Sequence, residues 1–123
     1  MPVLGLLDEG KGGGVMKILY KAPGEALRSM VIPNELGVMQ QLVDGYIEPV
    51  RLPDNLVIIC NEEGKINDMK KNFHIAAIND WIFGPALFMS DDGGEEFCSI
   101  KPEHEKLIRD YFDVLGTEGF NGK

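Results

Sequence analysis

The first patterned segment of the chain alternates apolar and polar residues. In residues 15–20 an apolar or aromatic side chain recurs at every second position, and Lys17 and Lys21 belong to the opposite face. This period of two predicts a strand with one buried face. A turn sequence at residues 22–25 separates it from a second apolar segment at residues 27–32, so we expect the two strands to form an antiparallel hairpin.

The next segment has the spacing of a short amphipathic helix. Asn34 can cap the free amide groups at its start, and Glu35 suits the positive end of the helix dipole. Gly45 is expected to end the helix in a left-handed conformation. The apolar face consists of Leu36, Met39, Leu42 and Val43.

Two strands are predicted after this helix. Residues 46–52 form the first, and Pro49 favours an edge or a bulge because proline lacks the amide hydrogen that a ladder needs. Residues 56–60 are apolar at every position, which predicts a strand covered on both faces at the centre of the sheet. A tight turn follows at residues 61–65, with Gly64 where a positive φ is expected.

A loop, a hairpin and a helix complete the predicted domain. Residues 66–77 show no regular pattern, so we expect a functional loop there. Residues 81–89 and 96–100 flank a turn at residues 91–94 and predict a second hairpin. A final helix begins at Pro102. Its apolar stripe consists of Leu107, Ile108, Tyr111, Phe112 and Leu115.

Taken in order, these elements predict an α+β fold of the form ββαββ-loop-ββα. The sheet is expected to be mostly antiparallel with about five to six strands, and both helices are expected on one face of it. Residues 15–116 form this single domain. Residues 1–14 end in a run of glycines and predict a flexible extension, and residues 117–123 predict a disordered tail.

The chain is acidic, with a formal net charge of −8 from 20 acidic and 12 basic side chains. This balance argues against unspecific binding to nucleic acid, and most of the excess lies after residue 79. No apolar run approaches the about 18 residues of a membrane helix, and no secretory leader pattern is visible. Cys60 and Cys98 lie in separate apolar stretches, so we interpret both as core residues of a cytoplasmic protein.

Two motifs have a spacing that suggests chemistry, and both fail in context. Residues 5–11 match the spacing of a phosphate-binding loop, but Gly12 stands where a Ser or Thr would bind magnesium. The acidic residues around the turn at residues 91–94 fit no calcium loop. We predict no metal and no cofactor, and we interpret the turn as a solvated hairpin tip, with an acidic recognition surface as the alternative. That surface would consist of Asp91, Asp92, Glu95 and Glu96.

Nothing in the sequence indicates a catalytic group. His74 and His104 are the only histidines, and neither is part of a metalloprotease motif or adjacent in sequence to a candidate nucleophile. A mechanism based on paired carboxylates stays open, because 20 acidic side chains allow many pairs. We therefore predict that the protein is not an enzyme, with a hydrolase as the remaining alternative.

Several motifs together resemble one known family. The residues that carry the resemblance are GYIEPV at 45–50, LVIICNEEGK at 56–65, Asn72 and IFGPA at 82–86. They resemble domain-of-unknown-function family 3846 over residues 16–112. Members of that family look like accessory proteins of phages, plasmids and conjugative elements, so the resemblance implies a mobile-element origin and carries no catalytic residue across. Polar positions of the motifs that packing does not demand are Glu48, Asn61, Glu62 and Asn72.

Two binding functions are predicted. The first is a non-enzymatic accessory protein that inhibits a host defence protein or complex, through an acidic surface that stands in for nucleic acid phosphates. The second is capture of a nucleotide, with phosphates at the loop of residues 65–74 and the base on an aromatic ring. The candidate binding residues are Glu48, Asn61, Glu62, Lys65, Lys70, Lys71, Asn72, His74, Tyr46 and Trp81.

Overall fold

The computed structural model describes residues 14–115, so residues 1–13 of the predicted extension and the predicted tail at residues 117–123 lie outside the described residues. Gly14, the last residue of that extension, is buried, and its carbonyl oxygen accepts a hydrogen bond from the Asn34 amide. Within this part of the chain, no helix is long and apolar enough to cross a bilayer. The elements are β1 (Val15–Lys21), β2 (Arg28–Pro33), α1 (Leu36–Val43), β3 (Ile47–Leu52), the 3-10 turn η2 (Pro53–Asn55), β4 (Leu56–Asn61), β5 (Lys71–Ile75), β6 (Asp80–Phe83), β7 (Ala86–Asp91), β8 (Phe97–Cys98) and α2 (Pro102–Leu115).

The predicted α+β fold is confirmed. A six-stranded antiparallel sheet has the order β2-β1-β7-β4-β3, with β8 paired to β7, and β5 and β6 form a separate two-stranded sheet. The hairpin β1–β2 forms as the sequence predicts. The second predicted hairpin forms between β7 and β8, but its expected first strand at residues 81–89 is divided, since residues 81–83 belong to β6 and pair with β5 in the other sheet. The edge position that Pro49 indicates is also confirmed, because β3 ends the strand order.

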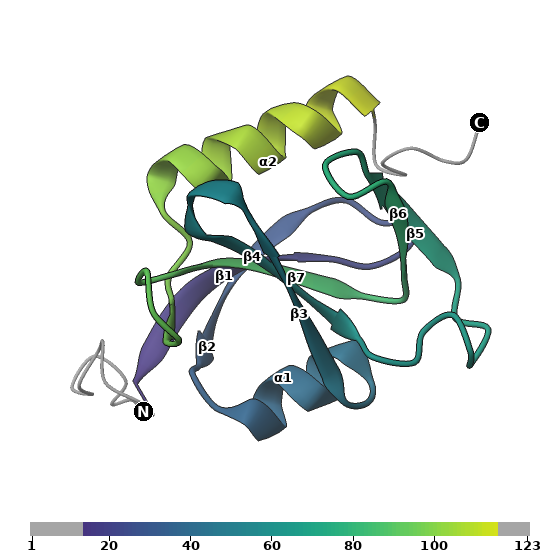
Figure 1. Cartoon of the computed structure of the whole chain (residues 1–123), viewed down its shortest axis with the longest axis horizontal. Helices are drawn as coiled ribbons and strands as arrows, with labels where there is room; N and C mark the ends of the chain where they lie inside the picture. Colours follow the sequence, from purple (N-terminus) through teal and green to yellow (C-terminus); the bar gives the residue numbers. More distant parts are fainter. Residues whose placement is uncertain (1–13, 116–123) are drawn as a thin grey trace.

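The two helices cover opposite faces of the sheet, so the prediction that both lie on one face is wrong. Leu56, Ile58 and Cys60 of β4 belong to the core under α2, which contributes Ile108 and Phe112. The other face of β4 contacts α1, so the sheet lies between the helices in Figure 1. The physical reason is that a strand with apolar residues at every position has two faces to cover.

The centre of the sheet also differs from the prediction. β4 is buried along its whole length, as predicted, but the middle of the strand order is β7, which is equally buried. The side chain of Lys21, predicted on a polar face of β1, is buried completely. Cys60 is buried in the core as expected, whereas Cys98 is only half-buried.

Residues 66–77 are not the loop that the sequence predicts, since they contain β5. This strand pairs with β6 in the β5–β6 hairpin, which lies on the α2 side of the sheet with Phe73, Ile75 and Ile82 in the core. The register of the pair shifts between Lys71 and Phe73. Because such a bulge places consecutive residues on one side, the period of two is lost and the strand is not visible in the sequence.

The ends of α1 differ from the predicted caps. Glu35 takes the N-cap position, without a side-chain hydrogen bond, and Asn34 instead donates a hydrogen bond to the carbonyl oxygen of Phe97. At the other end the left-handed residue is Asp44, with φ 63°, and not Gly45. Leu36 of the predicted apolar face is exposed, because α1 begins at this residue beyond the edge of the core.

The start of α2 is fixed to β7 by a buried pair that the sequence does not reveal. The Ser90 hydroxyl lies 2.7 Å from Nδ1 of His104 and accepts a hydrogen bond from the Lys101 amide. α2 begins at Pro102, as predicted. Leu107 of its predicted apolar stripe is exposed, so the buried stripe is narrower than expected.

Asn72 joins three parts of the fold. Its side-chain nitrogen donates to the carbonyl oxygens of Lys21 (2.9 Å) and Gly84 (2.8 Å), and its oxygen accepts a hydrogen bond from the Lys21 ammonium at 3.2 Å. All three hydrogen bonds are buried. Asn72 is therefore a structural residue and not the binding residue that the sequence suggests.

We expect the substitution Asn72→Ala to lower the free energy of unfolding by about 3 kcal/mol, because it leaves buried polar groups without their partner. Urea denaturation measures the change. Asn67→Ala is the matched control, since Asn67 is exposed and is expected to cost less than about 0.5 kcal/mol. Equal losses in the two variants would contradict the structural role of Asn72.

Candidate functional site

A cavity of about 470 Å³ lies between the sheet and the β5–β6 hairpin. One wall is β3, with Glu48, Pro49 and Val50, and the opposite wall is β6. Cys60 and Asn61, at the end of β4, and the turn that follows them complete the cavity. We call this cavity the hairpin pocket, and it is our candidate site.

The turn that closes the hairpin pocket is held close to β6. Gly64 in this turn is buried, and a Cβ atom at this position would lie 2.7 Å from the carbonyl oxygen of Phe83. Gly64 is therefore required for a close approach of two backbones and not for the positive φ that the sequence predicts, because it is not among the positive-φ glycines of the described residues. The Lys65 ammonium lies on the β6 side of the pocket.

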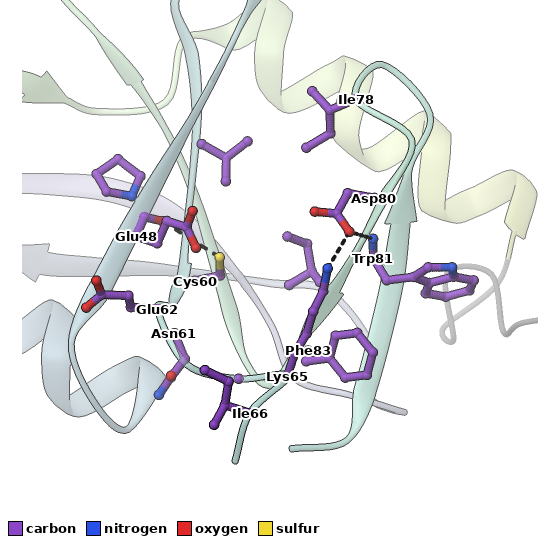
Figure 2. A pocket seen from close by; sticks show the side chains of 14 residues that line it. Glu48, Cys60, Asn61, Glu62, Lys65, Ile66, Ile78, Asp80, Trp81 and Phe83 are labelled. Carbon is purple, nitrogen blue, oxygen red and sulfur yellow. Dashed lines mark hydrogen bonds and ion pairs between the residues drawn. The ribbon is translucent and has the colours of Figure 1, made fainter. Parts of the chain in front are cut away.

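Two carboxylates dominate the charge of the pocket. Oδ1 of Asp80 accepts hydrogen bonds from the Lys65 ammonium at 2.6 Å and from the Trp81 amide at 2.8 Å. The hydrogen bond from Lys65 lowers the pKa of the Asp80 carboxyl. Figure 2 shows the carboxylates of Glu48 and Asp80 on opposite walls, each turned toward the space between them.

The pKa of the Cys60 thiol shows which charges act at the base of the pocket. This thiol lies 3.7 Å from the carbonyl oxygen of Glu48. Burial raises the pKa of the Cys60 thiol to about 12, and the negative charges of Glu48 and Asp80 raise it as well, whereas Lys65 lowers it. The two carboxylates therefore outweigh Lys65 at this point, and the thiol is neutral at physiological pH.

Half of the predicted binding residues line the hairpin pocket, namely Glu48, Asn61, Glu62, Lys65 and Trp81. Of these, the Trp81 indole points away from the opening in Figure 2, and Glu62 points outward from the other wall. Asn61 has a structural role, because its side chain donates to the carbonyl oxygens of Val43 and Asp44 at 3.0 Å each. Glu48 and Lys65 thus remain as predicted residues with charged groups at the cavity.

The predicted phosphate-binding residues are divided between the hairpin pocket, where Lys65 lies, and the surroundings of the Trp81 ring. Lys71 lies outside the pocket with its ammonium 4.4 Å from the centre of the Trp81 ring, and Lys70 is exposed elsewhere. His74 shares a hydrogen bond of 3.1 Å with Asn79, and its ring lies 5.3 Å from that of Trp81. Lys71 and His74 therefore both adjoin Trp81, and neither of them nor Lys70 lines the hairpin pocket with Lys65.

The predicted acidic surface is only partly correct. Asp91 is buried, forms an ion pair of 2.7 Å with Arg51 and accepts a hydrogen bond from the Gly93 amide, so it stabilises the turn. Asp92, Glu95 and Glu96 are exposed at the tip of the β7–β8 hairpin. The acidic surface at this tip is therefore smaller than the sequence suggests.

A second acidic surface forms where sequence reasoning did not place one. The Asn61 side chain joins the end of α1 to the turn after β4, and the Glu62 amide donates to the carbonyl oxygen of Tyr46 at 2.8 Å. These contacts bring together exposed residues that we call the Tyr46 patch: Asp44, Tyr46, Glu48, Glu62 and Glu63. Among residues 14–115, none of its four carboxylates has an ion-pair partner. The feature from which this surface could have been predicted is the pairing of β3 with β4, which places Ile47 opposite Asn61.

No catalytic or metal-binding group is evident in the described part of the chain. Residues 14–115 contain no cluster of three or more His, Cys, Asp or Glu side chains suited to a metal ion. Ser90 and His104 are close, but both are buried, so a substrate has no access to the hydroxyl.

Comparison with known proteins identifies the family. The model of the family described as domain of unknown function (DUF3846) matches residues 16–113. The chain belongs to this family. No curated protein and no solved structure matches the chain significantly. The comparisons therefore assign this DUF3846 protein no activity, and its function has to be argued from the site.

The raised pKa of Cys60 gives a direct test of the pocket's base. A thiol with a pKa of about 12 is ionised only to about one part in 10,000 at pH 8, so we expect iodoacetamide to leave Cys60 unmodified in the native protein. Modification should rise only as the pH approaches the raised pKa. Mass spectrometry of the alkylated peptides measures it, with the denatured protein as the control in which both cysteines react. Rapid native labelling of Cys60 at pH 8 would contradict the burial and the negative surroundings described above.

Proposed function

We propose that this DUF3846 protein is a non-enzymatic binding protein that contacts a basic surface of a partner protein through the Tyr46 patch. The observation that carries the proposal is a set of four exposed carboxylates without ion pairs in residues 14–115, which belong to the same part of the fold as the exposed Tyr46. Two of them, Glu48 and Glu62, also line the hairpin pocket. Tyr46 is 68% exposed. Exposed tyrosines beside pockets are frequent anchors of protein interfaces, and unpaired carboxylates complement a basic partner.

The Tyr46 patch has stronger support as the contact surface than the tip of the β7–β8 hairpin. The carboxylate of Asp91 at the tip is engaged in the ion pair with Arg51, and among the described residues the tip has no exposed large aromatic side chain. Interfaces depend on buried anchors more than on charge alone. The tip therefore serves as the comparison surface in the test below.

We further propose that the partner is a host protein or complex. This part rests on the mobile-element origin that the family resemblance implies. A small acidic protein can occupy a groove that normally binds nucleic acid, because its carboxylates take the place of phosphates. Inhibition of a host defence protein is the form of this function that we favour.

Capture of a nucleotide, the alternative, has less support. Among the described residues that line the hairpin pocket, Lys65 alone is basic, and its ammonium is already paired with Asp80 at 2.6 Å. Glu48 and Glu62 add two further negative charges to the lining, which oppose a phosphate group. A nucleotide would need cationic groups that this cavity does not provide.

Two variants with the same change in charge test the proposed surface. The patch variant carries Asp44→Asn, Glu48→Gln, Glu62→Gln and Glu63→Gln, and asparagine tolerates the left-handed backbone of residue 44. The tip variant carries Asp92→Asn, Glu95→Gln and Glu96→Gln at the tip of the β7–β8 hairpin, and Glu103→Gln in the first turn of α2 brings its change in charge to the same value. Each variant and the wild type are used to capture partners from a bacterial lysate, with quantification by mass spectrometry.

We expect the wild type and the tip variant to retain the same partner and the patch variant to lose it by about tenfold or more. Retention should also fall as the salt concentration rises from about 50 to about 300 mM, since exposed charges are screened. A partner that the patch variant retains at the wild-type level would refute the proposed surface. Loss only in the tip variant would assign the function to the β7–β8 hairpin.

A further inference from the structure

The hairpin pocket has the charge distribution of a site for a cation. Oδ1 of Asp80 accepts both of that carboxylate's hydrogen bonds, and within residues 14–115 its Oδ2 has no partner. The Glu48 carboxylate has no ion pair in the described part of the chain either. In Figure 2 the two carboxylates face the same space from opposite walls. A cation that enters this space has a carboxylate on each side of it.

The Lys65 ammonium does not itself lie between the two carboxylates as this cation. It is bound to Oδ1 of Asp80, on the β6 side of the pocket. The base of the cavity remains under the influence of both carboxylates, since Glu48 and Asp80 each raise the pKa of the Cys60 thiol and only Lys65 opposes them. The cavity therefore attracts a further positive charge in spite of the internal ion pair.

The remaining walls are apolar, which suits a cation on a long apolar stem. Pro49 and Val50 line the β3 side, and Ile82 lines the β6 side. Ile66 and Ile78 line the pocket as exposed hydrophobic residues, with exposed fractions of 79% and 43%. Large apolar side chains left in solvent beside a cavity are typical of surfaces that contact a ligand.

We propose that the hairpin pocket receives an arginine side chain of the partner protein, with the guanidinium between Glu48 and Asp80 and the methylene groups against Val50 and Ile82. The inference rests on the proposed function, because it names the group that the basic partner inserts. A guanidinium has five donors in one plane and is more weakly hydrated than an ammonium, so it can bridge two carboxylates on opposite walls at a smaller desolvation cost than lysine.

The test uses N-acetyl-arginine methylamide as the probe and the corresponding citrulline compound as the control, because citrulline has nearly the same shape without the charge. Binding to the full-length protein is followed by the NMR chemical shifts of backbone amides. We expect the arginine probe to shift the amides of Cys60, Asp80 and Ile82 and to bind about tenfold more tightly than the citrulline probe. Equal binding of the two probes, or no shift at the pocket, would overturn the proposal.

Two substitutions in the pocket should change the affinity for the arginine probe in opposite directions. Glu48→Gln removes one carboxylate and should weaken binding of the arginine probe by about tenfold. Lys65→Met keeps an apolar stem but releases Asp80 from its internal partner, so it should strengthen binding by about threefold. Glu96→Gln, an exposed change of the same charge outside the pocket, should leave the affinity unchanged. Weaker arginine binding in the Lys65→Met protein, or detectable binding of adenosine monophosphate that this change abolishes, would refute the arginine site.

The outcomes separate this inference from the proposed function. If the arginine probe fails to bind while the patch variant still loses its captured partner, the binding function stands and the arginine site is wrong. If the probe binds as expected but the patch variant keeps its partner, the cavity is an arginine site and the proposed contact surface is wrong.

Discussion

The structure depends on covering both faces of the two innermost strands. β4 and β7 pair with each other along four residues, and every side chain in both strands is buried. Each large apolar side chain removed from water contributes about 1.5–3 kcal/mol, so neither face of this pair can stay in solvent. α1 covers one face, and α2 together with the β5–β6 hairpin covers the other.

The hairpin pocket is a consequence of this arrangement. The β5–β6 hairpin buries Phe73, Ile75 and Ile82 against the α2 side of the sheet, but its strand β6 does not pair with the edge strand β3. The cavity is the space between these two strands, closed at one end by the turn that approaches Phe83. On the β6 wall, the hydrogen bonds from the Lys65 ammonium and the Trp81 amide hold the Asp80 carboxylate in place before any ligand binds. Such preorganisation reduces the ordering cost of binding.

Ion pairing determines which part of the acidic excess is available for a partner. Asp91 pairs with Arg51, and Glu105 pairs with both Lys17 and Arg109, so much of the acidic character of the last third of the chain is compensated within the fold. The Tyr46 patch, which lies in the middle of the sequence, has no such compensation in residues 14–115. A count of charges along the chain therefore does not show which carboxylates are available, because some of them pair with residues of distant strands, whereas Asp92, Glu95 and Glu96 have no ion pair in residues 14–115.

The sequence by itself determined the local elements: the two helices, the hairpins β1–β2 and β7–β8, the edge position of β3 and the complete burial of β4. These features follow from periodicity, glycine and proline, which act within a few residues. Only the tertiary structure decided that the helices cover opposite faces, that a bulged β5 replaces the expected loop, and that Asn61 and Asn72 are structural while Glu48 faces a cavity. The physical reason is that hydrogen-bond partners and covering surfaces come from distant segments of the chain. The local sequence pattern shows whether a residue is polar or apolar, but it does not show which residues that side chain contacts.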